Sequence, residues 1–448
     1  MQKNQKQRLI NLGEDTLAQA LLDLAPHSDD VEALIQRLIA TPEEAVARLK
    51  KKLTSLKRSR RFIDWREAGH FANELNNLLD DIEASISNPL IGMKLVTSFL
   101  ETDSSVFERC DDSNCSIGGI FADAKNLFVD YAKRYKDKKK ISTLLLKLTE
   151  TDDYGVRADL ISSVAECGIP EPLMRSMIET FQQRADTESG EYKKRHHLML
   201  IEFLARQLKD ASLFEDTRIA GWGEPLGTAA LINVAQVYFE QGDIDTAASR
   251  LSQIAENESF MSDDREKLWL AIYQQQGESA KTADLLQQRF HRYHSIGTLD
   301  AFVEAIGEER RNEVITSEIS FIFEQDKLDI LDAGFLLEIN KINEAEAYLL
   351  KHADQLNGNF YNSLLSLAEA LANENRPLVA SLIYRSLLQS ILERAYSKAY
   401  SHGVRYLKKL DVLSDMVEDW GRFNDHHAYK EQLVQTHGRK RSFWSKYG

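Results

Sequence analysis

Glycine and proline are scarce in this chain, and their scarcity limits the folds that it can adopt. Only 21 Gly and 7 Pro occur among 448 residues, whereas these two residues make up roughly 12% of an average soluble protein. All-β sandwiches and barrels need turn residues every ~8–12 positions, and phosphate-binding loops need clustered glycines. The content of 43% hydrophobic and 28% charged residues is that of a globular chain. The sequence therefore predicts an all-α protein without a β-sheet.

Prolines mark several expected helix starts. Thr41-Pro42-Glu43-Glu44 has the pattern of a capping box, and Asn88-Pro89 and Pro377 each precede an apolar run. In the first half, apolar residues also recur with the period of a helix. This pattern predicts helices over residues 5–24, 29–40, 42–60, 63–85, 89–101, 116–136, 141–150, 155–168, 171–184 and 191–208.

The second half repeats itself at an interval of 35 residues. The matching positions are Val234 and Trp269, Tyr238 and Tyr273, Gly242 and Gly277, Leu251 and Leu286, and Ala345 and Ala380. An aromatic residue, a turn glycine and then small residues are typical of tetratricopeptide hairpins. A hairpin of this kind cannot bury its apolar face alone and stacks on the next one. We expect four degenerate hairpins over roughly residues 226–396, which form an α-α superhelix.

A cluster of turn residues suggests where the chain is divided. Three glycines and a proline gather in residues 214–227. We therefore expect an irregular helical N-terminal region over residues 1–213, a joint over 214–227, and a tetratricopeptide-like region with C-terminal docking helices over 228–448.

The net charge of −14 is unevenly distributed. Residues 1–62 carry +4 and residues 400–448 carry +3, so the segment between them carries −21. An acidic body repels nucleic acids and anionic membranes, which leaves the two ends as sites for polyanions. No apolar stretch is long enough for a membrane span, and the first residues lack the pattern of a signal peptide. Three cysteines are an odd number, as expected in a reducing compartment, and we expect the cytoplasm.

The strongest charge feature is a basic segment over residues 48–61. It contains no acidic residue between Glu44 and Asp64, and its apolar residues share one arc of a helical wheel. The exposed face of this helix is therefore positive. It could pair with acidic segments of this chain or of a partner protein, or it could contact the phosphates of a nucleic acid. The acidic composition of the whole chain favours the protein interpretation. The binding candidates are Lys50, Lys51, Lys52, Lys57, Arg58, Arg60 and Arg61.

A smaller basic cluster lies at the C-terminal end of the sequence. Arg439, Lys440 and Arg441 are further binding candidates for an acidic ligand. Phe443 and Trp444 follow them, and we expect these aromatic residues to dock the last helix on the body of the protein.

Motifs for catalysis and for cofactors are missing from the sequence. Asp111 and Asp112 could hold a divalent ion, but acidic residues in such a loop more often cap the helix that follows, here from about Ser116. Cys110 and Cys115 lack the partners of a zinc site, and adjacent histidines such as His196 and His197 point apart on a helix. The sequence predicts no cofactor and no catalytic residue, and Asp111 and Asp112 remain the weak candidates for a metal.

Three stretches of the sequence resemble one family. They are ADQLNGNFYNSLLSLAEAL through SKAYSHGVRYLKKL to HHAYKEQLVQTHGRKRSFW, KRSRRFIDWREAGHFANELNNLLDDIE, and DDSNCSIG. The family is an uncharacterised bacterial one of all-helical proteins, known only as a domain of unknown function. A similar helical tail accompanies SWIM zinc-binding modules, but the CxC…CxH ligands of that module are absent here. The resemblance implies a helical fold and a bacterial cytoplasmic setting, and it supplies no catalytic residues.

Three hypotheses for the function follow. Stacked helical hairpins form concave surfaces that hold peptides or proteins, which favours a non-enzymatic scaffold or adaptor with a protein or peptide partner. Nucleic-acid binding through the basic helix 48–61 is the alternative. A metal-dependent hydrolase that uses Asp111 and Asp112 is the third.

Overall fold

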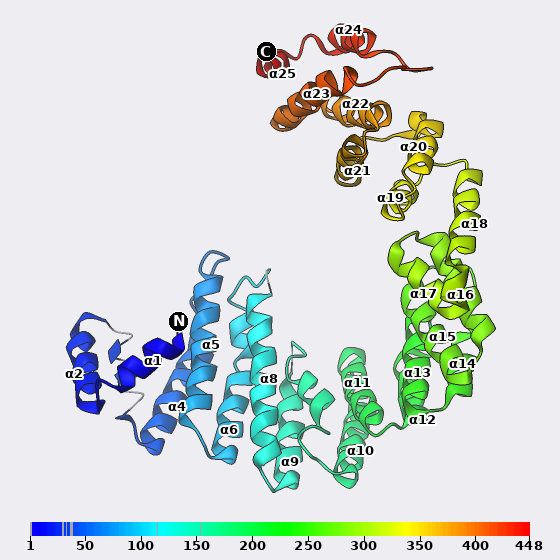
Figure 1. Ribbon diagram of the computed structural model, residues 1–448. Coiled ribbons are helices and arrows are strands. Elements are labelled where there is room, and N and C mark those ends of the chain that lie inside the picture. The colour runs from blue at the N-terminus through cyan, green and yellow to red at the C-terminus, as the bar shows by residue number, and fades with distance from the viewer. Residues whose placement is uncertain (1, 29–30, 33, 36–38, 114, 153) are drawn as a thin grey trace. The chain divides into compact units, whose positions relative to one another are not determined.

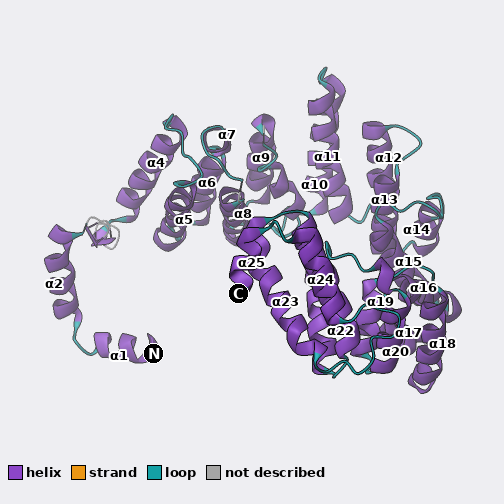
Figure 2. Ribbon diagram, turned by 90° about the horizontal axis from the view of Figure 1, so that it is seen from above, coloured by secondary structure: helices purple, strands orange, loops and turns teal. Residues whose placement is uncertain are grey.

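The computed structural model of the protein describes residues 2–28, 31–32, 34–35, 39–113, 115–152 and 154–448. Over these ranges the ordered elements are helices joined by loops, as Figure 2 shows. The one β-type contact among the described residues is an isolated parallel bridge between Ile63 and Cys110. The predicted all-α fold is therefore confirmed.

Two compact units divide the chain, Met1–Arg265 and Glu266–Gly448. Figure 1 labels their helices in chain order. The α-helices of the first unit are α1 (Gln2–Ile10), α2 (Glu14–Leu24), α4 (Pro42–Arg58), α5 (Ala68–Ser85), α6 (Pro89–Leu100), α7 (Asp103–Phe107), α8 (Ser116–Arg134), α9 (Lys138–Leu148), α10 (Glu171–Thr187), α11 (Glu191–Gln207), α12 (Ala211–Trp222), α13 (Thr228–Gln241) and α14 (Ile244–Leu251). It also contains the 3-10 helices η1 (Ala25–His27), η2 (Thr149–Thr151) and η3 (Ala158–Ser163).

The boundary between the units falls within helix α15 (Ser262–Gln276). The remaining α-helices of the second unit are α16 (Ser279–Arg292), α17 (Ile296–Ile306), α18 (Arg311–Glu324), α19 (Ile330–Glu338), α20 (Ile342–Lys351), α21 (Tyr361–Asn373), α22 (Pro377–Glu393), α23 (Tyr400–Ser414), α24 (His426–His437) and α25 (Arg441–Tyr447). Its 3-10 helices are η4 (Glu308–Arg310), η5 (Ala353–Gln355) and η6 (Ser397–Ala399).

Two of the helices predicted in the first half take a different form. The segment 5–24 is two helices rather than one, because Gly13 has a φ of 84° and separates α1 from α2. The segment 155–168 forms only the short helix η3. The predicted helix 29–40 includes residues 29–30, 33 and 36–38, which lie outside the described residues.

Turns between paired helices share one backbone geometry. A positive φ occurs at Lys209, Gly242, Gly277, Asn340 and Asn375. In each turn the following N–H donates to the carbonyl five residues earlier at 2.8–3.0 Å, which is the hydrogen bond of a Schellman motif. The pairs are Asp210 to Ala205, Asp243 to Tyr238, Glu278 to Tyr273, Lys341 to Leu336 and Arg376 to Leu371. The turns predicted at Gly242 and Gly277 are confirmed, and the same turn recurs at two asparagines 35 residues apart.

Helices α13 to α22 lie within residues 226–396, where four hairpins were predicted. The consecutive helices that pack closely on one another there are α13 and α14, α16 and α17, α19 and α20, and α21 and α22. The sequence spacing gave no signal for α17 and α18, which are joined through Gly307 and η4. Ala345 and Ala380, predicted to let two helices approach closely, are both fully buried.

Each unit has its own hydrophobic core. Phe121, Phe128 and Leu200 are almost completely buried in the first unit, and Phe290 and Leu388 are completely buried in the second. None of the described helices combines the length and the apolar composition that crossing a bilayer requires.

The last helices are docked on α23 as the aromatic residues suggested. Phe443 is completely buried, and the indole Nε1 of Trp444 donates to the carbonyl of His437 at 3.0 Å. Asp411 of α23 accepts hydrogen bonds from Lys430 of α24 at 3.0 Å and from the hydroxyl of Tyr447 of α25 at 2.6 Å. These contacts secure the end of the second unit.

Candidate binding surface

Helix α4 carries most of the predicted binding residues, and its sequence explains why it forms. The backbone N–H of Glu44 donates to Oγ1 of Thr41 at 3.3 Å, and the backbone N–H of Thr41 donates to Oε2 of Glu44 at 2.8 Å. This is the predicted capping box, with Pro42 at the first helical position. Leu49 and Leu53 are buried on the opposite face. The helix therefore packs by one stripe and exposes its basic side.

The helix ends at Arg58, so Arg60 and Arg61 lie on the loop that follows rather than on a helix 48–61 as expected. Ser59 has an extended backbone, and the loop then pairs with the chain after α7. The backbone N–H of Ile63 donates to the carbonyl of Arg109 at 2.8 Å. Residues 63–67 take part in this loop and do not form the start of the predicted helix 63–85. The long-range contact anchors the loop that carries Arg60 and Arg61.

The seven predicted binding residues of this region fall into two groups. Three pair with acids of the same unit: Lys52 with Asp81 at 3.1 Å, Lys57 with Glu101 at 3.7 Å and Arg61 with Glu67 at 2.5 Å. The Lys57 and Arg61 pairs are the more exposed ones and contribute little to stability, about 0–1 kcal/mol each, whereas Asp81 is buried. The members of the second group are all exposed, and no acidic oxygen of a described residue lies within 4.0 Å of them. They are Lys50, Lys51, Arg58 and Arg60.

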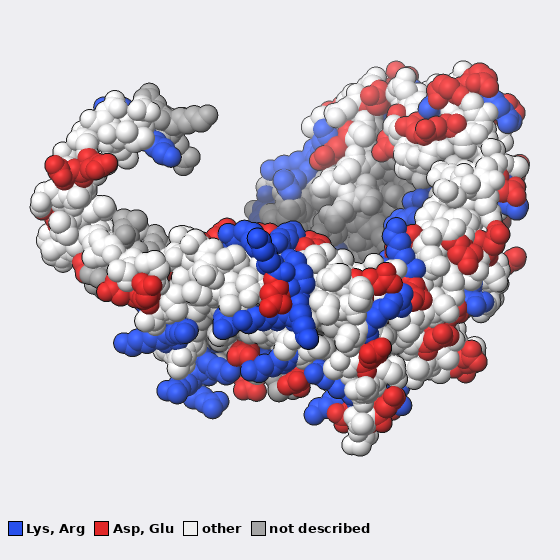
Figure 3. All heavy atoms as spheres, turned by 90° about the horizontal axis from the view of Figure 1, so that it is seen from below, with Lys and Arg blue, Asp and Glu red and all other residues white. Residues whose placement is uncertain are grey.

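On the face drawn in Figure 3, Lys and Arg side chains gather in more than one place. We call Lys50, Lys51, Arg58 and Arg60 the α4 basic patch. Since the protein's own acids pair with other cations of this region, the patch keeps positive charge that an external acidic group can neutralise.

A groove of about 490 Å³ lies beside α4. Its basic lining residues are Lys52, Arg61 and Arg109, and Phe71 and Glu74 of α5 also line it. Arg109 is only 8% exposed, and its guanidinium lies 4.7 Å from the centre of the Phe71 ring. Its Nη1 donates to the carbonyl of Arg61 at 3.2 Å, whereas its Nε has no hydrogen-bond partner. Burial lowers the pKa of Arg109. A ligand acceptor that reached this Nε would satisfy a buried donor.

Two aromatic side chains stand exposed next to the loop arginines. Phe62 is 64% exposed and Trp65 is 66% exposed. The guanidinium of Arg66 lies over the Trp65 ring at 5.2 Å. Aromatic residues are enriched in protein–protein interfaces. The rings of Phe62 and Trp65 add apolar contact area to the α4 basic patch.

The other predicted candidates lie elsewhere. Both carboxylate oxygens of Asp112 accept backbone N–H groups of the first turn of α8, from Ile117 at 2.8 Å and from Gly118 at 3.0 Å. Asp111 accepts from the backbone and side chain of Ser113, and these bonds lower its pKa. Asp112 thus makes the helix cap that the sequence favoured.

The second basic cluster belongs to the other unit. Arg439 and Lys440 lie between α24 and α25, and Arg441 begins α25. Arg439 and Arg441 are exposed, and Lys440 is half-buried.

Sequence reasoning missed Arg109, Phe62 and Trp65. Arg109 follows Arg61 by 48 positions, and only the pairing of Ile63 with the chain near Cys110 brings the two arginines together. The sequence FIDW directly after the basic run was the available signal for the two aromatic residues.

Comparisons with known proteins yield one family and a solved structure. No curated protein matches the chain. Among solved structures, the chain is similar to a circular tandem repeat protein with novel repeat topology and enhanced subunit contact surfaces, at 14% identity and a TM-score of 0.15, over 96% of this chain and 93% of that one. The profile of one family, described as a family of unknown function (DUF6880), matches residues 2–446. Because this match spans nearly the whole sequence, the chain belongs to the DUF6880 family.

Proposed function

We propose that this helical-repeat protein is a scaffold that binds an acidic segment of a partner protein on the α4 basic patch and in the groove beside it. The observation that carries the proposal is the exposure of Lys50, Lys51, Arg58 and Arg60 with no acidic oxygen of a described residue within 4.0 Å. Lys50, Lys51 and Arg58 lie on a helix that is capped and packed, and Arg60 follows on the adjoining loop, so most of the patch is preorganised for a ligand.

The groove explains why a peptide is favoured over a simple counterion. Arg109 offers a buried Nε without a partner, and Arg61 and Lys52 line the same groove. A carboxylate side chain fits this chemistry, because charge-assisted hydrogen bonds from a guanidinium are the stronger ones. The exposed rings of Phe62 and Trp65 would cover apolar side chains of the same segment. The free state of Cys110, Cys115 and Cys167 supports a reducing compartment such as the cytoplasm for this activity.

The test is a binding titration of the full chain with a fluorescein-labelled peptide rich in Glu and Leu, followed by fluorescence anisotropy. We expect charge reversal of Lys50, Lys51, Arg58 and Arg60 to Glu to weaken binding at least about tenfold. Binding by the wild type should also weaken between about 0.05 and about 0.2 M salt, since exposed charges are screened over a Debye length of about 10 Å.

A matched control reverses four exposed lysines of the same unit that lie at α9, namely Lys136, Lys139, Lys140 and Lys147. This control variant makes the same change in net charge, and its affinity for the peptide should stay within about twofold of the wild-type affinity. Equal losses in the two variants would show that overall charge, and not the α4 basic patch, attracts the peptide.

Single-stranded nucleic acid is the second candidate ligand, and the exposed aromatic residues favour it. Bases stack on such rings with about 1–3 kcal/mol each. A labelled single-stranded RNA in the same titration separates the two classes. If RNA binds and the Trp65→Ser variant loses that binding while the acidic peptide fails to bind, the second function replaces the first.

A further inference from the structure

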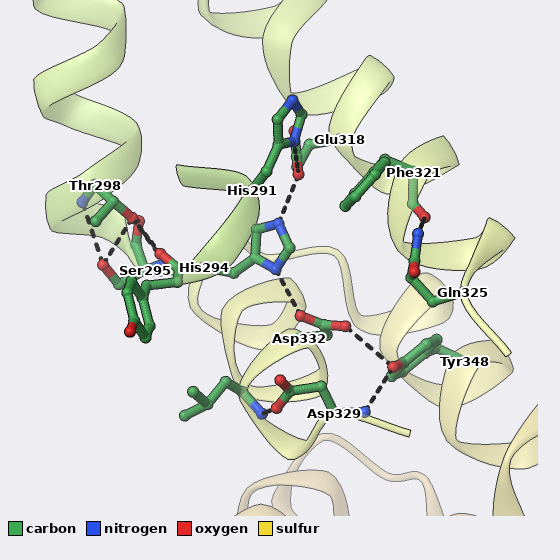
Figure 4. Close-up of polar contacts among 12 residues, drawn as sticks. His291, His294, Ser295, Thr298, Glu318, Phe321, Gln325, Asp329, Asp332 and Tyr348 are labelled. Carbon is green, nitrogen blue, oxygen red and sulfur yellow. Dashed lines mark hydrogen bonds and ion pairs between the residues drawn. The ribbon is translucent and has the colours of Figure 1, made fainter. Parts of the chain in front are cut away.

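A cluster of two histidines and two carboxylates lies in the second unit. Its residues are far in sequence from those of the α4 basic patch. His291 is in the last turn of α16, and His294 follows just before α17. Glu318 belongs to α18 and Asp332 to α19. Figure 4 shows these side chains pointing toward one another from four different elements. The tertiary structure therefore assembles a site that no local motif contains.

Two imidazole nitrogens face the same carboxylate oxygen. Nδ1 of His291 lies 2.7 Å from Oε1 of Glu318, and Nε2 of His294 lies 2.6 Å from that oxygen. The ligand atoms of these three residues all lie within 4.8 Å of one another. His294 and Glu318 have side chains that are 5% and 3% exposed, and that of His291 is 32% exposed. The cluster is buried on one side and open to solvent on the other.

A second layer of hydrogen bonds fixes the orientation of His294. Its Nδ1 lies 2.6 Å from Oδ1 of Asp332, and Oδ2 of Asp332 accepts from the hydroxyl of Tyr348 at 3.1 Å. The Tyr348 hydroxyl in turn accepts the backbone N–H of Asp329 at 3.0 Å. Metal-binding histidines almost always donate their second N–H to a carboxylate or carbonyl in this way. Asp332 thus holds the proton of Nδ1 and leaves Nε2 directed at Glu318.

The charges of the cluster also favour a bound cation. Two buried carboxylates, Glu318 and Asp332, flank His294. Nε2 of His294 lies 2.6 Å from Glu318, and its Nδ1 lies 2.6 Å from Asp332. A divalent ion bound by His294 and Glu318 would bring positive charge to these buried acids, which are costly to bury unpaired.

We propose that His291, His294 and Glu318 bind a divalent transition-metal ion through one imidazole nitrogen each and a carboxylate oxygen. Imidazole ligands favour ions such as Zn²⁺ over Mg²⁺ and Ca²⁺, which prefer oxygen. Ligands at about 2.1 Å from a tetrahedral zinc ion lie about 3.4 Å apart. At present the two nitrogens lie 2.7 and 2.6 Å from Oε1 of Glu318, and all three atoms lie within 4.8 Å of one another, so binding needs an adjustment that the partly exposed His291 can make. Three protein ligands leave a fourth position for water or an external ligand.

The inference does not depend on the proposed function, because the two sites belong to different units. Its test uses the full chain after treatment with a chelator and dialysis. Zn²⁺ binding is measured by calorimetry, and Co²⁺ binding is measured by visible absorption, which reports nitrogen and oxygen ligands in tetrahedral geometry. We expect one site per chain in both measurements.

The variants identify the ligands. His291→Ala removes a ligand at a partly exposed position and should weaken Zn²⁺ binding at least about tenfold. Asp332→Asn should weaken it about 10–100-fold, as changes to outer-shell partners do. His402→Ala changes an exposed histidine of the same unit and should leave binding unchanged. Circular dichroism shows whether each variant is folded, and His291→Cys, which keeps a zinc ligand, should restore binding.

Two results would overturn the proposal. One is the absence of heat and of Co²⁺ bands with the wild type. The other is equal Zn²⁺ affinity of the folded His291→Ala variant and the wild type, which would place any bound ion elsewhere. In either case His294 is a buried ionic link between α18 and α19 and no metal ligand.

Discussion

Single residues in this protein take their roles from partners that are distant in sequence. Asp103 stands at the start of a segment with little helical pattern, yet its side chain is completely buried. It accepts from Nε of Arg157 at 3.0 Å and from Nη2 at 2.5 Å, in a bidentate pair between α7 and the residue before η3. The Arg157 side chain is 5% exposed. Such a pair is sensitive to the loss of one member, because the other charge stays buried.

We predict that Arg157→Met lowers the free energy of unfolding by about 3–5 kcal/mol, since the carboxylate of Asp103 remains buried without its partner. Urea denaturation followed by circular dichroism measures the change. The double variant Arg157→Met/Asp103→Leu should recover much of the loss. Lys133→Met, which breaks an exposed pair with Glu166, should have little effect. A stability for Arg157→Met equal to that of the wild type would contradict this account.

At the scale of elements, one turn geometry recurs with different residues. Gly242 and Gly277 adopt the left-handed conformation without steric cost, but Lys209, Asn340 and Asn375 adopt it as well. Asparagine tolerates this region because of its short polar side chain, whereas lysine does not have that advantage. The stacking of helix pairs therefore imposes the turn even where the local sequence opposes it.

We predict that Lys209→Gly raises the stability of the protein by up to about 1 kcal/mol, because it relieves a left-handed lysine. Gly242→Ala, at a φ of 97°, should lower it by about 1 kcal/mol, although no atom within 4 Å would clash with the added Cβ. The chemical control is Lys94→Gly at an exposed position within α6, which should lower stability by about 1 kcal/mol. Thermal and urea denaturation check all three signs. If Lys209→Gly and Lys94→Gly shift the midpoint in the same direction, the turn is not strained.

For the whole molecule, the division into two compact units predicts how it unfolds. Each unit has a separate core, and only α15 contains residues of both. In repeat proteins, stability is carried by contacts between neighbouring repeats, so distant repeats need not unfold together. A single two-state transition is therefore not expected for a chain of this length.

We predict that Leu200→Ala and Leu388→Ala, two completely buried positions in different units, each destabilise mainly their own unit by about 2–5 kcal/mol. Hydrogen exchange measured by mass spectrometry at increasing urea reads peptides of the two units separately. Protection should fall in residues 1–265 for the first variant and in residues 266–448 for the second. Equal loss of protection in both units for either variant would show that the chain unfolds as one cooperative body.

Local signals in the sequence predicted the fold more fully than the sites. The capping box at Thr41 and Glu44, the turn at Gly242 and the buried Ala345 follow from short-range rules, and all three are present. The helix expected over residues 42–60 ends at Arg58, and the backbone pairing of Ile63 with the chain near Cys110 joins segments that no short-range rule connects. The Arg109 groove and the histidine cluster were missed because their members come from segments that are far apart in the sequence.

Composition, helical periodicity and a 35-residue spacing were enough to establish an all-α repeat fold with one positive helix face. These are local properties, because hydrogen bonds within a helix and the stripe that it buries depend on residues a few positions apart. The pairing of His291 and His294 with Glu318, and of Arg109 with the basic loop, required the packed chain. Such contacts join side chains dozens of residues apart, and only the packing of helices against one another brings them within hydrogen-bonding distance.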